Sequence, residues 1–168
     1  SERTATESAL LIAKLASALQ AVHDLGTQHR NIKASNVLID RRGEPILMDF
    51  GLAGLHEHVI QTNSTIGTAA YMAPEQGTNG ETTSDHRADI YSLGVLFFQM
   101  LTGRLPYLGS TTRVLLQIAT QPPPAIGSIC PDVDPSVATL CERAMAREPS
   151  ARFSSAAEFE SALRSYLD

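Results

Sequence analysis

The stretch HRNIKASN at residues 29–36 decides the fold of this chain, together with Asp49-Phe50-Gly51, which begins thirteen residues after Asn36. The third position of the first stretch is Asn31. Its side-chain amide can hydrogen-bond a hydroxyl group, but it cannot accept the proton of that hydroxyl at neutral pH. A motif of three residues arises by chance in many unrelated chains, so the interpretation depends on the order and spacing of further motifs along the chain.

Further short motifs come after these two in a fixed order. They are Gly67-Thr68, Ala73-Pro74-Glu75, Asp89-Ile90-Tyr91-Ser92-Leu93-Gly94 and, near the end of the chain, Arg152. This succession resembles the C-terminal lobe of protein kinases, in particular the serine/threonine type found in bacteria, from roughly Ser8 to Leu167. The resemblance implies a mainly α-helical lobe with a short β-hairpin and a long activation segment, so that residues 1–168 form one partial kinase domain.

The resemblance also implies a site for ATP and Mg²⁺. Asp49 and Asn36 would hold the metal ion, since a hard cation prefers oxygen ligands such as carboxylate and amide groups. Lys33 would be aimed at the transferred phosphate and would offset the charge that develops there. Leu38 resembles the apolar residue that lies beneath the adenine ring. We therefore expect Lys33, Asn36 and Asp49 to converge on one nucleotide-facing cleft.

Three residues would take part in catalysis by the same resemblance: Asn31, Lys33 and Thr68. Kinases carry an aspartate where Asn31 stands, and that aspartate receives the proton of the attacking hydroxyl. Thr68 matches the threonine that contacts this aspartate and the lysine, so its partner here would be Asn31. The loss of a positioned proton acceptor typically lowers a rate by about 10²–10⁴.

Two functions therefore remain open. The first is a serine/threonine protein kinase that transfers phosphate from ATP to protein substrates, with impaired turnover. The second is a pseudokinase that serves as a scaffold or regulatory binding module. No glycine-rich G-x-G-x-x-G loop and no V-A-I-K-like strand precedes Ser8. Because these belong to the small lobe that covers the nucleotide, we expect that lobe as a missing partner and expect this chain alone to be inactive.

Other matching residues have structural roles in the family. Asp89 resembles the aspartate that anchors the backbone of the catalytic loop. Glu75 and Arg152 resemble an ion pair that fastens the end of the activation segment to the lobe, and such a pair matters most when one partner is removed. Phe50 and His29 match a stacked pair that couples the metal-binding turn to the lobe.

The segment from Asp49 to Glu75 matches the activation segment. Thr62, Ser64 and Thr65 lie where such kinases are phosphorylated, and Arg30 could receive the phosphate through charge-assisted hydrogen bonds. The alternative, with comparable weight, is that these are solvated loop hydroxyls. The polar run from His56 to Tyr71 lacks helical or strand periodicity and is predicted to be a loop. His56 and His58 are assigned to that loop rather than to a metal site.

Apolar spacing predicts the secondary structure. Leu11, Leu15, Leu19 and Val22 share one side of a helix that Gly26 ends. A second helix, stopped by Gly103, carries so few polar residues that it should be buried on nearly all sides. The Gln121–Pro124 run is assigned as a stiff spacer rather than a ligand. The predicted helices are Ser8–Leu25, Asp85–Thr102, Thr111–Ala119, Asp134 to about Ala146 and Ser155 to about Leu167. Asp134 caps its helix with Pro135 in the first turn, and Ser155 with Glu158 forms a capping box. Val37–Asp40 and Ile46–Met48 form a hairpin, which must lie on a larger body because two short strands alone are marginally stable.

Composition indicates a globular protein, with 43% hydrophobic and 18% charged residues among 168. The net charge of −5 and the lack of a basic run argue against nucleic acid or anionic membranes as partners. Two cysteines, Cys130 and Cys141, fit buried or half-buried thiols in a reducing compartment. No apolar run approaches the ~18 residues of a membrane span and no signal peptide is found, so we expect a cytoplasmic protein.

Overall fold

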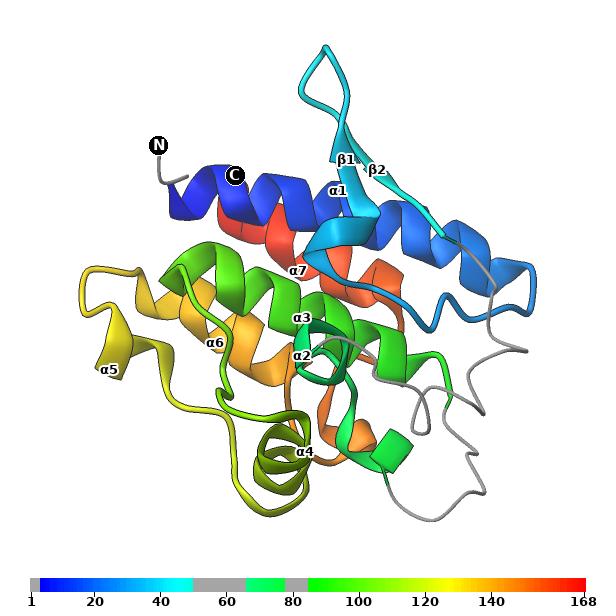
Figure 1. The fold of residues 1–168 in the computed structure, drawn as a ribbon. Helices are drawn as coiled ribbons and strands as arrows, with labels where there is room; N and C mark the ends of the chain where they lie inside the picture. The colour runs from blue at the N-terminus through cyan, green and yellow to red at the C-terminus, as the bar shows by residue number, and fades with distance from the viewer. Residues whose placement is uncertain (1–3, 50–65, 78–84) are drawn as a thin grey trace.

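The computed structural model describes residues 4–49, 66–77 and 85–168 (Figure 1). The predictions made for Phe50, His56, His58, Thr62, Ser64 and Thr65 lie outside the described residues. The helices are α1 (Ala5–Asp24), α2 (Ile66–Ala69), α3 (Arg87–Thr102), α4 (Thr111–Thr120), α5 (Ile126–Ile129), α6 (Pro135–Ala144) and α7 (Ala156–Leu167). The strands are β1 (Val37–Ile39) and β2 (Pro45–Leu47), and short 3-10 helices are η1 (Ala34–Asn36), η3 (Pro74–Gly77) and η4 (Pro149–Ala151).

Helix α3 lies at the centre of the lobe, as its composition predicted. All residues from Ala88 to Phe98 are buried. Helices α1, α6 and α7 contact α3, and α7 also runs along α1 (Figure 1). The close approach of α3 and α6 depends on Gly94, because a Cβ there would lie 2.9 Å from both the Cβ of Ala144 and the Cγ of Met145. The mainly α-helical lobe is confirmed.

Helix α1 begins three residues earlier than predicted. The hydroxyl of Thr4 accepts the backbone N–H of Glu7 at 3.1 Å, while the Glu7 carboxylate accepts the backbone N–H of Thr4 at 2.8 Å. This capping box satisfies N–H groups that a helix start leaves unpaired. The inward face differs in part from the prediction: Ile12, Leu15 and Leu19 are buried, while the predicted Leu11 and Val22 are half-buried.

The hairpin of β1 and β2 is confirmed and stands out from the helices (Figure 1). Val37 pairs with Leu47 and Leu38 with Ile46 in an antiparallel register. Because residues directly opposite share a face, Leu38 and Ile46 point to the same side. A salt bridge of 2.6 Å between Lys14 and Glu44 ties the hairpin turn to α1. The expectation that two short strands must lie on a larger body is therefore met.

The prediction missed or misplaced some local features. Residues Ile66–Ala69 form one helical turn where a loop was predicted, and α5 was not predicted. Helix α6 ends at Ala144, two residues early. The capping box of α7 is only half formed: the Ser155 hydroxyl accepts the Glu158 N–H, but the Glu158 carboxylate binds Ser154 and Arg143 instead of the Ser155 backbone.

Both cysteines are free thiols, with Cys130 half-buried and Cys141 buried, as predicted. Helix stops at Gly26 and Gly103 are also confirmed, since both have left-handed φ angles of 72° and 71° that favour glycine. Among the described residues, no helix has both the length and the apolar composition that crossing a membrane requires.

Candidate active site

The backbone of the loop at residues 29–36 is anchored by Asp89, as predicted. Asp89 lies in the first turn of α3 and is 2% exposed. One carboxylate oxygen accepts the backbone N–H of His29 at 2.8 Å, and the other accepts that of Arg30 at 2.7 Å. The helix N-terminus favours a negative charge at this position. The central helix therefore fixes where the loop begins.

Two residues of the site have strained backbones. Arg30 has a φ of 63° and Asp49 a φ of 61°, in the left-handed region. Such a conformation costs about 1–3 kcal/mol for a residue other than glycine and persists where the surroundings enforce it. For Arg30 the hydrogen bond to Asp89 supplies that restraint. The Arg30 side chain is exposed, and its Nε donates to Gln28 at 3.2 Å.

His29 joins the loop to the segment that precedes Asp49. Its Nδ1 accepts the backbone N–H of Asn31 at 3.2 Å, so its Nε2 carries the proton and donates to the Met48 carbonyl at 3.0 Å. The bond at Nδ1 requires the neutral ring, whereas the protonated ring can also donate from Nε2. Burial lowers the pKa of His29 below its usual 6.5 and outweighs the Asp89 and Asp49 carboxylates, which favour the charged ring.

The lowered pKa of His29 predicts a pH dependence of stability. Above pH 6.5 the ring is neutral in both the folded and the unfolded chain. As the pH falls from 6.5 towards the lower pKa of the folded state, the unfolded chain binds the proton first, so stability decreases. We expect the stability advantage of the natural chain over His29→Gln, measured by urea unfolding, to shrink between pH 7.5 and pH 5. A constant difference would contradict this assignment.

Asn36 and Asp49 are brought to one place through Met48. The Asn36 carbonyl accepts the Met48 N–H at 2.8 Å, and His29 holds the Met48 carbonyl, so Asp49 comes directly after a residue held on both sides. Asn36 is 6% exposed and its amide nitrogen donates to the Asn31 carbonyl at 2.8 Å. This leaves the amide oxygen as the end of the side chain that can bind a cation.

A carboxylate and an amide oxygen suit Mg²⁺, which accepts one or two protein ligands and completes its shell with phosphate and water oxygens. Within the described parts of the chain, no three His, Cys, Asp or Glu side chains gather into a metal cage. Asn36 and Asp49 could supply two oxygen ligands to a metal ion that arrives with phosphates.

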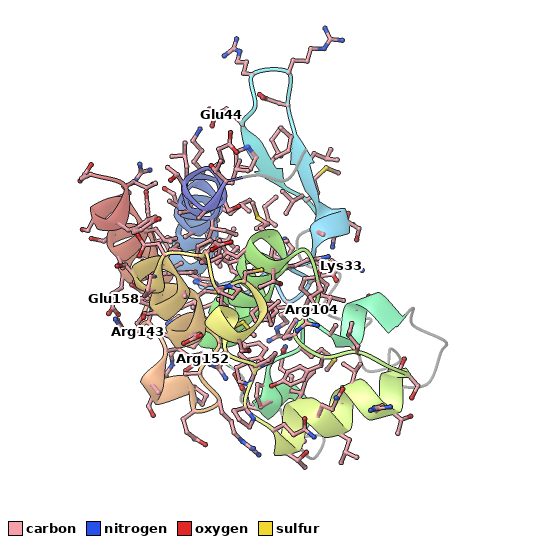
Figure 2. The ribbon with its side chains drawn as sticks, turned by 90° about the vertical axis from the view of Figure 1, so that its left-hand side faces the viewer. Lys33, Glu44, Arg104, Arg143, Arg152 and Glu158 are labelled. Atoms are coloured by element: carbon pink, nitrogen blue, oxygen red, sulfur yellow. The ribbon has the colours of Figure 1, made fainter. Side chains whose placement is uncertain are left out.

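Lys33 reaches from the loop to α2. Its Nζ donates to the hydroxyl of Thr68 at 3.1 Å, and Figure 2 shows Lys33 near the base of the hairpin. Thr68 was expected to pair with Asn31. In the described residues its side-chain hydrogen bond goes to Lys33, whose ammonium group donates to the hydroxyl oxygen. The lysine and the threonine are therefore brought together as predicted, while the bond to Asn31 is not found.

Leu38 lies on an exposed apolar face of the hairpin. It is 51% exposed, and Ile46, its partner across the strands, is 49% exposed. Met48, two residues beyond Ile46, is 39% exposed. The opposite face carries Leu47, which is buried. The hairpin thus offers an apolar surface next to the polar groups of Asn36 and Asp49.

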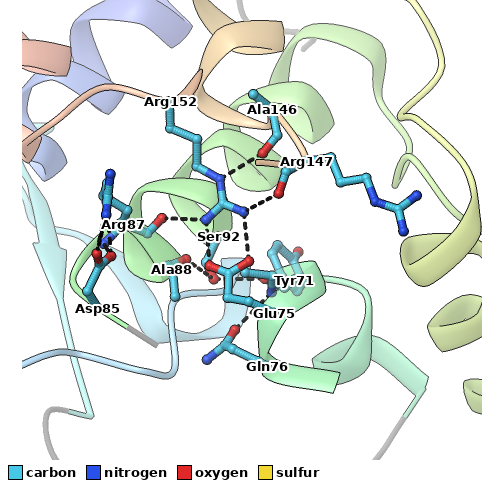
Figure 3. Close-up of polar contacts among 11 residues, drawn as sticks. Tyr71, Glu75, Gln76, Asp85, Arg87, Ala88, Ser92, Ala146, Arg147 and Arg152 are labelled. Carbon is cyan, nitrogen blue, oxygen red and sulfur yellow. Dashed lines mark hydrogen bonds and ion pairs between the residues drawn. The ribbon is translucent and has the colours of Figure 1, made fainter. Parts of the chain in front are cut away.

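Glu75 and Arg152 form the predicted ion pair (Figure 3). Two guanidinium nitrogens donate to the two oxygens of Glu75, each at 2.7 Å. The Arg152 side chain is fully buried, whereas that of Glu75 is 24% exposed. Arg152 also donates to three backbone carbonyls, those of Arg87, Ala146 and Arg147. It therefore joins η3, α3 and the segment before η4.

Sequence reasoning missed the carbonyl partners of Arg152 and also missed His23. The Nε2 of His23 lies 2.9 Å from Asp89, although 66 positions separate the two residues. No local pattern could have indicated this contact, because it arises where the end of α1 meets the start of α3. From the sequence alone, a single histidine in the last turn of an apolar helix would be interpreted as an ordinary surface residue.

Comparisons with known proteins agree with this geometry. A family model described as protein kinase domain matches residues 2–165. The chain is 38% identical over 162 residues to serine/threonine-protein kinase Pkn1 of Myxococcus xanthus, covering 92% of this chain and 23% of that protein. It is 37% identical over 158 residues to PknB of Mycolicibacterium smegmatis (91% and 25%) and 35% identical over 158 residues to PknH of Mycobacterium tuberculosis (92% and 25%). The chain thus spans about a quarter of the length of these relatives.

Proposed function

Because this chain belongs to the protein kinase family, and to its bacterial serine/threonine type, we propose that it forms the large lobe of a site that transfers phosphate from ATP to protein serine or threonine. Residues 1–168 would be one partial kinase domain. Asn36 and Asp49 would hold Mg²⁺, Lys33 would face the transferred phosphate, and Leu38 would lie under the adenine ring. Bound MgATP would supply the phosphoryl group and the charge neutralisation that this reaction requires.

The observation that carries this proposal is that both backbone polar groups of Met48 are hydrogen-bonded within the site. Its N–H bonds to the carbonyl of Asn36 and its carbonyl to the ring of His29, and Asp49 is the next residue. The backbones of Asn36 and Asp49, thirteen residues apart in the sequence, are thus held close to one another, and their side-chain oxygens would bind the metal ion. Positioning of this kind, rather than covalent chemistry, supplies most of the catalysis in phosphoryl transfer.

Asn31 favours a second candidate, a pseudokinase that binds nucleotide without efficient turnover. Its amide cannot take the proton of the attacking hydroxyl, although Lys33, Asn36 and Asp49 keep the chemical groups that metal and phosphate need. Under this candidate the site senses nucleotide and the lobe acts on a protein partner. The two candidates share the nucleotide site and differ in turnover, which the Asn31→Asp variant separates.

The nucleotide site is tested by thermal unfolding with ATP, in the presence of either Mg²⁺ or EDTA. The chain is fused to the small lobe of a bacterial serine/threonine kinase, which contributes the glycine-rich loop that covers the phosphates in this family. We expect ATP to raise the Tm of this fusion with Mg²⁺ but not with EDTA, since binding to the folded state stabilises it. The Asp49→Ala variant should lose the shift.

Asp24→Ala serves as the matched control. Asp24 is also an exposed aspartate, at the end of α1, and accepts a hydrogen bond only from Gln20 in the part of the chain that the structure describes. This variant should keep the full shift with Mg²⁺. An equal shift in the Asp49→Ala variant would remove Asp49 from the proposed site.

A further inference from the structure

His23 and Asp89 form a buried polar contact beneath the loop at residues 29–36. The His23 Nε2 lies 2.9 Å from one Asp89 oxygen, and the two side chains are 6% and 2% exposed. That same oxygen accepts the backbone N–H of His29, while the other oxygen accepts that of Arg30. The carboxylate is therefore held from one side by α1 and in turn holds the loop on the other.

The ring of His23 has one orientation that suits this contact. A carboxylate only accepts hydrogen bonds, so Nε2 must carry a proton. The ring of His86 packs edge-on against that of His23, with the centroids 5.4 Å apart, and His86 Nε2 is itself bonded to the Ser154 carbonyl at 2.7 Å. Packing by His86 thus keeps Nε2 of His23 directed at Asp89.

The other ring nitrogen of His23, Nδ1, lowers the stability of the fold. Nδ1 is buried and has no hydrogen-bond partner among the described residues. A buried polar atom without a partner destabilises a fold, and an apolar ring of similar size would avoid that loss. His23 is thus unfavourable for stability at Nδ1, whereas its Nε2 makes the contact with Asp89.

We propose that His23 is a positioning residue for phosphoryl transfer. By holding Asp89, it keeps both carboxylate oxygens on the N–H groups of His29 and Arg30, and so maintains the strained backbone of Arg30. Asn31 and Lys33 come soon after in the chain, so their placement depends on this support. The role in transfer rests on the proposed function, whereas the support of the loop by His23 can be measured without it.

Two amide variants distinguish the effect of losing the Nε2 hydrogen bond to Asp89 from the effect of losing the imidazole ring. In His23→Gln the side-chain NH₂ can reach the position of Nε2, whereas in His23→Asn the shorter amide reaches only that of Nδ1. The measurement is hydrogen–deuterium exchange of single backbone amides, read by NMR. We expect the N–H groups of His29 and Arg30 to exchange about tenfold faster in His23→Asn, and to stay within about threefold of the natural chain in His23→Gln.

The amide of Met145, which bonds to the Cys141 carbonyl in α6, reports on global stability. Unchanged exchange at Met145, together with faster exchange at His29 and Arg30 in the Asn variant alone, supports the proposal. Equal acceleration at Met145 and Arg30, or no difference between the Gln and Asn variants, overturns it. These readouts do not require any enzyme activity.

The consequence for transfer is measured in the small-lobe fusion that carries Asn31→Asp. We expect His23→Asn to lower kcat about tenfold with the KM for ATP within about twofold, and His23→Gln to restore most of the rate. An unchanged kcat in His23→Asn would overturn the positioning role. If the fusion transfers no phosphate in any variant, the proposed function fails, and the exchange pattern alone decides whether His23 supports the loop.

Discussion

Replacement of Asn31 by aspartate is expected to raise the rate of phosphoryl transfer about 10²–10⁴-fold in the small-lobe fusion, the range that a positioned general base contributes. The backbone at this position is already held on both sides. The Asn31 N–H bonds to Nδ1 of His29, and the Asn31 carbonyl accepts the amide of Asn36. Because aspartate and asparagine have nearly the same shape, the change adds a proton acceptor without moving the loop.

The rate is measured as transfer of radiolabelled phosphate from ATP to a generic protein substrate at saturating MgATP. Asn31→Ala is the control, since it removes the amide without adding a base, and it should stay at the low rate. The KM for ATP should change little in either variant, because residue 31 is not among the proposed ligands of nucleotide or metal. Equal rates for the natural and Asn31→Asp forms would show that Asn31 is not the limiting defect.

Replacement of Arg152 by methionine is expected to lower the free energy of unfolding by about 3 kcal/mol, the lower end of the range for a broken buried ion pair. Methionine fills part of the same volume, so the loss reports on the missing charge and hydrogen bonds. The change leaves three backbone carbonyls without their donor and removes the guanidinium group from Glu75. Glu75 is 24% exposed and can regain some water, which is why the lower end applies.

Urea unfolding followed by circular dichroism measures this loss. Arg164→Met is the matched control, because Arg164 is 51% exposed and pairs with Glu160 one helical turn away. Exposed pairs of this kind contribute about 0.3–0.5 kcal/mol. Adding Glu75→Gln to Arg152→Met should recover part of the stability, since it removes the carboxylate charge that the Arg152 guanidinium offset. A loss for Arg152→Met no larger than that for Arg164→Met would contradict the structural role of the pair.

Much of the fold could be predicted because its signals are local. The glycines at 26 and 103 end helices through a backbone conformation that other residues rarely adopt. The apolar composition of α3 predicted its burial, and Asp134-Pro135 marked the start of α6. The prediction was wrong where several nearby donors compete for one acceptor group. Glu158, for example, binds Ser154 and Arg143 and does not complete the capping box of α7.

The candidate site divides in the same way. Family resemblance alone indicated Asp89 as the anchor of the loop and Glu75 with Arg152 as an ion pair, and the structure confirms both. The roles of Lys33, Asn36 and Asp49 in binding MgATP stay predictions. Thr68 was expected to contact both Lys33 and Asn31, and among the described residues its side-chain hydrogen bond is the one from Lys33.

By itself, the sequence determined the family of this protein, its five longer helices and its hairpin, and the asparagine that replaces the proton acceptor, because motif order, apolar period and glycine position are properties of the chain. Only the tertiary structure decided that His23 contacts Asp89, that Met48 is bonded to both His29 and Asn36, and that Arg152 donates to three backbone carbonyls. These contacts join groups that lie in different elements. Their geometry is set by how α1 and the loop pack on α3, and packing depends on all the side chains between them.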